Sequence, residues 1–246
     1  MQSKRECDIT LMRFGARTDG GKVREANEDA FLALPPWFAV ADGMGGHVAG
    51  EVASQMAIDE IRKIAEAEPE ECEIKKILQN TMISANQIIW QKGQKDSNLT
   101  GMGTTLTVAV IVGVNCVLAH VGDSRCYLWQ KSGLQLLTKD HSVVGELIRT
   151  GTLSENEANL HPQRNVLTRA LGSNPSVEVD IIDMNVQSKS RLLLCSDGLT
   201  SVVKPEDIEL VLSKVKDPKK AVDELIDKAN KKGGPDNITV VLVDIP

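Results

Sequence analysis

The chain has 246 residues, a net charge of −6 and 41% hydrophobic residues, values that are ordinary for a globular protein and exclude a disordered or fibrous chain. Aromatic residues make up only 3% of the chain, which disfavours a base-stacking nucleic-acid surface, and the acidic balance disfavours general binding to a phosphate backbone. The five cysteines are widely spaced and form no C-x-x-C pair, so we expect reduced thiols rather than disulfides or a zinc site.

The N-terminal segment carries charges and has no long apolar core over residues 1–12, so we expect no secretory signal. The most apolar stretch, 106–121, is interrupted by polar residues and is shorter than the ~20 apolar residues that a membrane-spanning helix needs. We therefore expect a cytoplasmic protein without membrane insertion, built as one domain over residues 1–246.

Hydrophobic periodicity predicts an alternation of strands and helices. Short apolar runs between turn residues predict strands at 30–34, 37–41, 104–112, 116–121, 125–129, 135–138, 177–184, 191–195 and 238–243. Apolar residues at helical spacing predict helices over 46–64, from about 71 until Gly93 and Ser97 end it, and over 142–149, 204–214 and 219–230. Residues 151–165 are polar and irregular and predict an exposed lobe. This order predicts an α+β domain, mostly antiparallel β with helices packed outside.

Three aspartates stand at the ends of predicted strands. Asp42 and Asp197 follow strands, and Asp236 precedes one. Because neighbouring antiparallel strands run in opposite directions, these ends can lie at one edge of the sheets. At any single site a turn is the commoner explanation of an Asp-Gly pair, but clustered carboxylates repel one another and need a cation. Three more acidic residues stand beside strands, at Glu28, Asp29 and Asp123.

The kinds of side chain in the candidate site indicate which metal and which class of reaction to expect. An all-oxygen set favours Mg²⁺ or Mn²⁺ over Zn²⁺. Residues 96–107 begin like a calcium-binding EF-hand loop, but Thr107 stands where that loop needs a bidentate glutamate. The sequence has no Walker phosphate loop, dinucleotide fingerprint, G-x-S-x-G or H-E-x-x-H motif. Metal-assisted hydrolysis with water as nucleophile is the chemistry that remains.

Seven short motifs follow one another between residues 24 and 239: Arg24–Asp29, Ala41–His47, Gly103–Thr105, Gly122–Arg125, Asp140–His141, Leu194–Gly198 and Asp236–Thr239. As an ordered set they resemble the metal-dependent serine/threonine phosphatases of the protein phosphatase 2C type, in their bacterial branch. The resemblance implies a central antiparallel β-sandwich flanked on both sides by α-helices. It also implies a centre of two Mn²⁺ or Mg²⁺ ions at one end of the sandwich and a mobile flap over about 151–165 beside it.

The resemblance further implies which residues bind metal. Asp42 is expected to bridge both ions and Gly43 to offer its carbonyl oxygen to one of them. Asp197 and Asp236 are expected to bind the other ion. Asp123, together with Asp197, is expected to bind a third and weaker ion.

Four other residues are expected to support the reaction. Arg24 matches the arginine that binds substrate phosphate, although an arginine alone is more often a solvated surface charge. Glu28 and Asp29 resemble residues that hold metal-bound waters or support the ligands, and Asn237 stands beside them in the last motif.

The general acid is the point at which the sequence departs from the animal relatives. Those proteins place a histidine directly after the Asp-Gly pair, whereas this chain has Met44 there and its nearest histidine is His47. The departure leaves His47 and a metal-bound water as the two candidates for protonating the leaving group.

The resemblance implies an enzyme that dephosphorylates phosphoserine and phosphothreonine in proteins, acts as a monomer and opposes a bacterial serine/threonine kinase. A non-catalytic relative is disfavoured because Asp42, Asp197 and Asp236 are all retained. Another two-metal hydrolase, such as a nuclease, is disfavoured by the net charge of −6 and the lack of a basic stripe.

Overall fold

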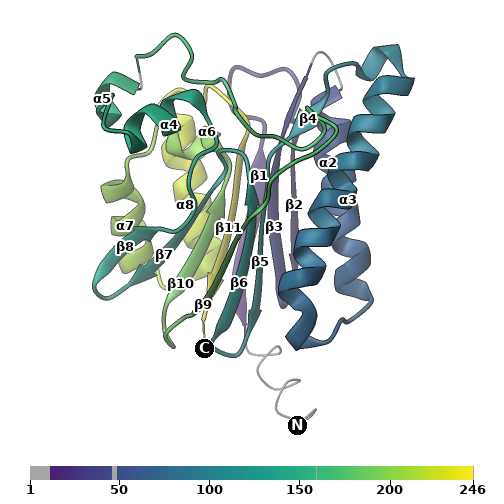
Figure 1. Cartoon of the computed structure of the whole chain (residues 1–246). Helices are drawn as coiled ribbons and strands as arrows, with labels where there is room; N and C mark the ends of the chain where they lie inside the picture. Colours follow the sequence, from purple (N-terminus) through teal and green to yellow (C-terminus); the bar gives the residue numbers. More distant parts are fainter. Residues whose placement is uncertain (1–11, 46–48, 159, 246) are drawn as a thin grey trace.

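Two antiparallel sheets packed face to face form the centre of the fold, in a computed structural model that describes residues 12–45, 49–158 and 160–245 (Figure 1). The first sheet has the strand order β1 (Arg13–Asp19), β11 (Ile238–Asp244), β10 (Arg191–Cys195), β7 (Arg125–Gln130) and β8 (Gly133–Leu136). The second has the order β2 (Asp29–Leu34), β3 (Trp37–Met44), β5 (Leu106–Val112), β6 (Asn115–Val121) and β9 (Asp180–Asn185), with the short β4 (Gly103–Thr104) paired to the end of β3.

Two pairs of long helices cover the outer faces of the sheets (Figure 1). The second sheet is covered by α2 (Ala49–Glu66) and α3 (Ile74–Lys95), and the first by α7 (Pro205–Lys214) and α8 (Pro218–Lys231). Three short helices lie at the upper end of the sandwich in Figure 1: α4 (Val143–Arg149), α5 (Glu155–Ala158) and α6 (Asp197–Thr200). Within the part of the chain that the structure describes, no helix combines the length and apolar character needed to cross a bilayer.

Strand β3 shows why the predicted strand runs are apolar throughout. Phe38 and Val40 point into the layer between the two sheets, whereas Trp37, Ala39 and Ala41 point into the layer beneath α2 and α3. All five side chains are at most 3% exposed. A strand that is covered on both faces has no solvent side on which to place polar residues, so its sequence is continuously apolar rather than alternating.

Side-chain caps explain where two of the helices begin. The Ser142 hydroxyl accepts a hydrogen bond from the Gly145 N–H and starts α4, and the Asp217 carboxylate accepts one from the Lys219 N–H and starts α8. Pro218 occupies the first position of α8, where the missing N–H of proline costs no helical hydrogen bond.

The predicted fold class is confirmed: the chain is an α+β sandwich with helices on both outer faces. The sequence pattern missed β1, and it placed the edge strands β8 and β9 two residues too late and three residues too early. It also ended the second helix near Gly93, whereas α3 continues to Lys95. Gly93 is buried where a Cβ would lie 3.2 Å from the Leu99 carbonyl oxygen, so this glycine permits a close approach rather than a stop.

Candidate active site

Five aspartates at the ends of strands lie near enough to influence one another's charge: Asp29, Asp42, Asp123, Asp197 and Asp236. Asp29 and Asp42 are directly opposite each other on the neighbouring strands β2 and β3. Asp123 lies in the loop between β6 and β7, Asp197 begins α6 directly after β10, and Asp236 lies just before β11. Because all the neighbouring strands are antiparallel, strand ends that are distant in sequence meet at this one edge.

Burial and mutual repulsion raise the pKa of four of these carboxyl groups. The pKa of Asp42 lies well above its ordinary value because the group is buried and faces the charges of the other four aspartates. Burial, with neighbouring carboxylates adding to it, raises the pKa of Asp29 to about 7, of Asp123 to about 8 and of Asp197 to about 6. Such a group cannot ionise completely near neutral pH without added positive charge.

Arg24 brings positive charge to the rim of this cluster. It lies in the loop between β1 and β2 and grips Asp236 with two nitrogens, Nη2 to Oδ2 and Nε to Oδ1, both at 2.8 Å. Its side chain is 53% exposed, so the guanidinium borders solvent beside the carboxylates. The structure therefore places Arg24 beside the aspartate cluster, and its role toward substrate phosphate stays a prediction.

The backbone of Asp42 is held from one side by a pair of buried threonines. The Asp42 N–H donates to Thr105 Oγ1 at 2.9 Å, and the Asp42 carbonyl accepts from the Thr105 N–H and the Thr104 hydroxyl, each at 2.9 Å. Sequence reasoning assigned these threonines no role, although the motif Gly103–Thr105 and its position before an apolar strand were the available signal.

Asp29 connects the two sheets through Ser196. The Ser196 hydroxyl donates to Asp29 Oδ2 at 2.7 Å and accepts from the Thr239 N–H at 2.9 Å. Asn237 holds the loop before β2 in place. Its Oδ1 accepts from the Glu28 N–H at 2.8 Å, and its Nδ2 donates to the Ala26 carbonyl at 2.9 Å. Asn237 thus fixes the backbone beside Glu28 and Asp29, and its supporting role in the reaction stays a prediction.

The glycines after Asp42 and Asp197 serve close packing. A Cβ on Gly43 would overlap the carbonyl oxygen of Gly50 at the start of α2, and one on Gly198 would overlap the carbonyl oxygen of Asn237. Neither glycine has a positive φ, so neither forms the hairpin turn that an Asp-Gly pair most often signals. The turn interpretation of these two motifs is therefore wrong.

The chemistry of the donors fits a hard divalent cation. The donors are carboxylate and carbonyl oxygens, which Mg²⁺ and Mn²⁺ prefer. Two buried carboxylate oxygens, Glu28 Oε1 and Asp29 Oδ1, have no hydrogen-bond partner among the described residues, and such atoms are usually satisfied by an ordered water or an ion. No three acidic, histidine or cysteine side chains in the described ranges converge closely enough to chelate an ion as they stand, and Asp236 faces Arg24.

Two further predictions concern the surroundings of the cluster. His47 lies outside the described residues. Met44 ends β3 with its terminal methyl against Gly103. The lobe over 151–165 contains the short helix α5 and lies with α4 at the same end of the sandwich as the aspartates (Figure 1).

Comparisons with known proteins agree with this geometry. The family model described as protein phosphatase 2C matches residues 22–239. The chain is 44% identical over 239 residues to the serine/threonine phosphatase stp of Listeria monocytogenes serotype 4b, with 93% of this chain and 94% of that protein covered.

Solved structures give the same result. The crystal structure of the Mycobacterium tuberculosis serine/threonine phosphatase PstP/Ppp is similar with a TM-score of 0.89 and 39% identity, covering 95% of this chain and 98% of that one. The catalytic domain of PstP in complex with two manganese ions has a TM-score of 0.88 and 37% identity, covering 95% and 97%. The chain therefore belongs to the protein phosphatase 2C family and is a phosphatase of that family.

Proposed function

We propose that this protein removes phosphate from phosphoserine and phosphothreonine in proteins, with water as nucleophile at a centre of two Mn²⁺ or Mg²⁺ ions. The observation that carries the proposal is the convergence of five aspartates whose pKa values are raised by burial and by one another. The manganese complex of the similar PstP catalytic domain supports it.

The aspartates divide the work of holding the ions. Asp42 faces the charges of all four other aspartates and is the ligand best placed to be shared by two ions. Gly43 would offer its carbonyl oxygen to one ion, Asp197 and Asp236 would bind the other, and Asp123 would contribute to a third, weaker site. When bound, divalent ions lower the pKa of water and neutralise charge on the phosphoryl group.

Arg24 orients the substrate phosphate. A guanidinium matches two phosphate oxygens in a planar fork, and Arg24 already uses this geometry on Asp236. Its exposed position at the rim allows the side chain to bind an incoming dianion while the aspartates hold the ions. Ser196 and Asn237 keep Asp29 and Glu28 in place behind the ligands.

The proposal extends to the setting in which the enzyme works. Residues 1–246 form one catalytic domain that acts as a monomer in the cytoplasm and opposes a serine/threonine kinase. The flap over 151–165 contacts the protein chain around the phosphorylated residue. Its exposed Leu160 (84%) is suited to an apolar neighbour of that residue.

The reaction is tested with the wild-type protein after treatment with EDTA. Mn²⁺ is expected to restore hydrolysis of a phosphothreonine peptide and to produce no cleavage of DNA or RNA. The matched control is Asp183→Asn, an exposed aspartate on β9 that should leave activity unchanged. Full hydrolysis in EDTA, or nuclease activity with Mn²⁺, would contradict the proposal.

The flap is tested by deleting α5 (Glu155–Ala158). A small aryl phosphate needs only the ions and Arg24, so kcat/KM for it should change little. Selectivity among phosphothreonine peptides should change more, because loops of this kind serve recognition when they carry little core packing. Equal losses on both kinds of substrate would reject substrate selection by the flap.

A further inference from the structure

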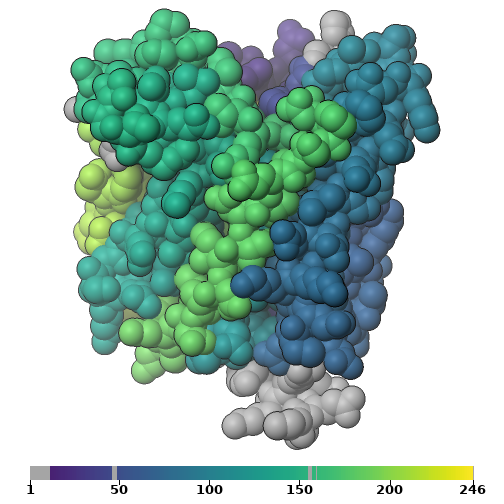
Figure 2. Space-filling view, viewed as in Figure 1, coloured from purple at the N-terminus to yellow at the C-terminus, as the bar shows by residue number. Residues whose placement is uncertain are grey.

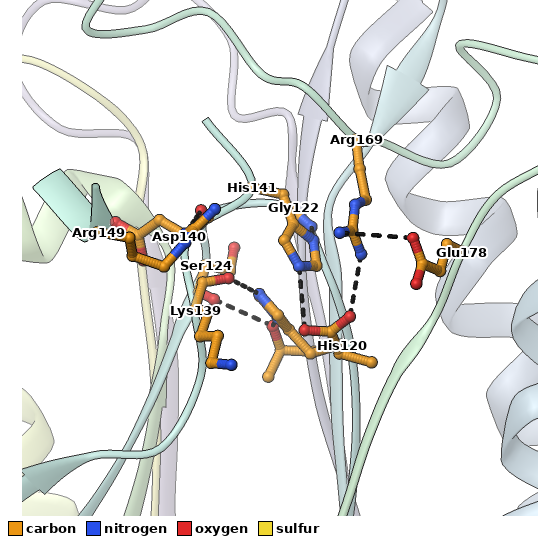
Figure 3. Close-up of polar contacts among 11 residues, drawn as sticks. His120, Gly122, Ser124, Lys139, Asp140, His141, Arg149, Arg169 and Glu178 are labelled. Carbon is orange, nitrogen blue, oxygen red and sulfur yellow. Dashed lines mark hydrogen bonds and ion pairs between the residues drawn. The ribbon is translucent and has the colours of Figure 1, made fainter. Parts of the chain in front are cut away.

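The loop that carries Asp123 is held by one residue from a distant part of the chain. His141 donates its backbone N–H to the Gly122 carbonyl at 2.8 Å, and His141 Nδ1 accepts the Gly122 N–H at 3.1 Å. Both backbone polar groups of the residue before Asp123 therefore bind His141 (Figure 3). Gly122 has a φ of +111°, and a Cβ there would lie 2.6 Å from the Thr105 side chain, so this position requires glycine.

The imidazole of His141 is fixed in one tautomer. Nδ1 accepts a hydrogen bond from an N–H, so the ring proton lies on Nε2, which donates to Asp180 Oδ2 at 3.2 Å. Arg169 binds the other oxygen of Asp180 at 3.0 Å and also pairs with Glu178 (Figure 3). The His141 side chain is only 2% exposed, so water does not compete for either nitrogen.

His141 is also the point at which the chain leaving the flap is attached. Its carbonyl accepts the Thr168 N–H at 2.8 Å, and the next pairing joins the Val143 N–H to the Val166 carbonyl at 2.9 Å. Farther along, Leu171 exchanges two backbone hydrogen bonds with Thr104. Figure 2 shows the segment that follows, in bright green, beginning beside the blue helices and running diagonally down across the face of the molecule.

We infer that His141 is a positioning residue, which sets the loop of Asp123 through Gly122 and ties it to the base of the flap. The inference rests on the proposed function only in taking Asp123 as a ligand of the weakest ion. Among the described residues, the hydrogen bonds of His141 go to Gly122, Asp180 and Thr168, none of which is a proposed ligand of an ion. A residue of this kind is expected to change ion affinity by roughly 10-fold when its hydrogen bond is lost.

Two substitutions separate the hydrogen bond to Gly122 from the one to Asp180. In His141→Asn the amide oxygen can occupy the place of Nδ1 and accept the Gly122 N–H. In His141→Gln the amide can reach Asp180 but leaves the Gly122 N–H without an acceptor. Mn²⁺ binding is measured without substrate, from the electron paramagnetic resonance signal of free Mn²⁺, for both variants and for Asp123→Ala.

The expected result is specific to the weakest class of Mn²⁺ site. His141→Gln should weaken that class by roughly 10-fold, His141→Asn should restore most of the loss, and the tighter ions should be unaffected. In an Asp123→Ala background His141→Gln should have no further effect. Equal losses in the two histidine variants, or an undiminished effect in that background, would overturn the inference. So would a wild type whose binding Asp123→Ala does not change.

The proposed function fails separately, if the wild type binds no Mn²⁺ at all. Should His141→Gln not fold, exchange of the Gly122 amide decides the question. Asp180→Ala, which removes the partner of His141 Nε2, should speed that exchange. Glu178→Ala, which removes only the second partner of Arg169, should not. Unchanged exchange in Asp180→Ala would overturn the inference.

Discussion

The aspartate cluster and the neighbouring arginine–histidine cluster lie at the same end of the sandwich, yet they balance their charges differently. In the aspartate cluster, Arg24 pairs with Asp236 at the rim while Asp29, Asp42 and Asp197 face one another. In the other cluster, Arg125 grips Asp140 with Nη2 to Oδ2 at 2.6 Å and Nε to Oδ1 at 3.0 Å.

The histidines extend the second cluster without adding net charge. His120 Nδ1 meets the Thr107 hydroxyl at 2.9 Å and its Nε2 meets the Lys139 carbonyl at 3.0 Å. His141 binds Gly122 and Asp180, and its ring lies 4.8 Å from that of His120. Burial lowers the pKa of both histidines, so both rings are neutral at neutral pH.

The difference shows how burial of polar groups can serve two ends. Where each charge has an internal partner, the cluster rigidifies the fold and needs no ion or water to satisfy it. Where like charges are gathered with a partner at the rim alone, the cluster destabilises the folded chain until a cation binds. The structure thus separates a network whose charges are paired internally from the aspartate cluster proposed to bind metal.

The largest expected effect is on activity. Asp42→Asn preserves shape but removes the carboxylate that the proposed function shares between two ions, so kcat/KM on a phosphothreonine peptide should fall by on the order of 10³-fold or more. In EDTA, the Tm of this variant should equal or exceed that of wild type, because one repelling charge is gone. A folded variant with full Mn²⁺-dependent activity would contradict the assignment of Asp42.

The matching change in the arginine–histidine cluster should lower the stability of the fold. Asp140→Ala leaves the Arg125 guanidinium half-buried without its carboxylate, which should lower the free energy of unfolding by about 2 kcal/mol. Urea titration with and without Mn²⁺ measures the loss, which should be similar in both conditions. If Asp140→Ala were as well tolerated as Asp42→Asn in EDTA, the contrast between the clusters would be lost.

Arg24 tests the rim of the aspartate cluster. Arg24→Ala should raise KM for a phosphopeptide roughly tenfold, the equivalent of about 1.4 kcal/mol for a lost charge-assisted contact, with a smaller effect on kcat. Arg24→Lys should recover little, because a point charge does not reproduce the fork. Arg17→Ala, a surface arginine paired with Asp223, is the control. A fall in kcat at constant KM would instead place Arg24 in transition-state stabilisation.

The metal-free protein should lose stability as pH rises. The pKa values of Asp29 and Asp123 are raised to about 7 and about 8, so between pH 6 and pH 8 the folded state holds protons that the unfolded state has already released. Unfolding free energy in EDTA should therefore decline across this range, by up to about 1.4 kcal/mol per pH unit for each proton. Saturating Mn²⁺ should remove the decline, and a flat profile in EDTA would argue against the repulsion.

The contribution of the buried histidines to the free energy of unfolding should change with pH in the opposite direction and by a smaller amount. Burial lowers the pKa of His120 to about 4, so between about pH 6.5 and pH 4 the unfolded state binds a proton that the folded state does not. Stability should fall as pH drops through this window. Because carboxylates also titrate there, His120→Gln is compared with wild type in urea titrations. The free energy of unfolding of His120→Gln should depend less steeply on pH than that of wild type, by the equivalent of up to one bound proton. Equal slopes would refute this contribution of His120.

Much of the fold was predictable because burial leaves a recognisable pattern of apolar residues in the sequence. Strands β3, β5, β6, β10 and β11 are covered on both faces, which makes them apolar runs that need no knowledge of their partners. Strand β1 left no such signal, because Arg13 and Arg17 make it half exposed and it acquires its place only by pairing with β11. The position of the edge strands β8 and β9 depended likewise on neighbours far away in the chain.

The sequence by itself determined which residues are candidates for the chemistry: the aspartates beside glycines, their order along the chain and the oxygen-only character of the donors follow from residue types and local spacing. Only the tertiary structure decided which other residues hold these aspartates in place. That Ser196 holds Asp29, that Thr105 holds Asp42, and that His141 holds the loop of Asp123 depends on contacts between distant segments. Such contacts require a specific packing of two sheets, and no local pattern encodes the distance between residues that meet only when the chain folds.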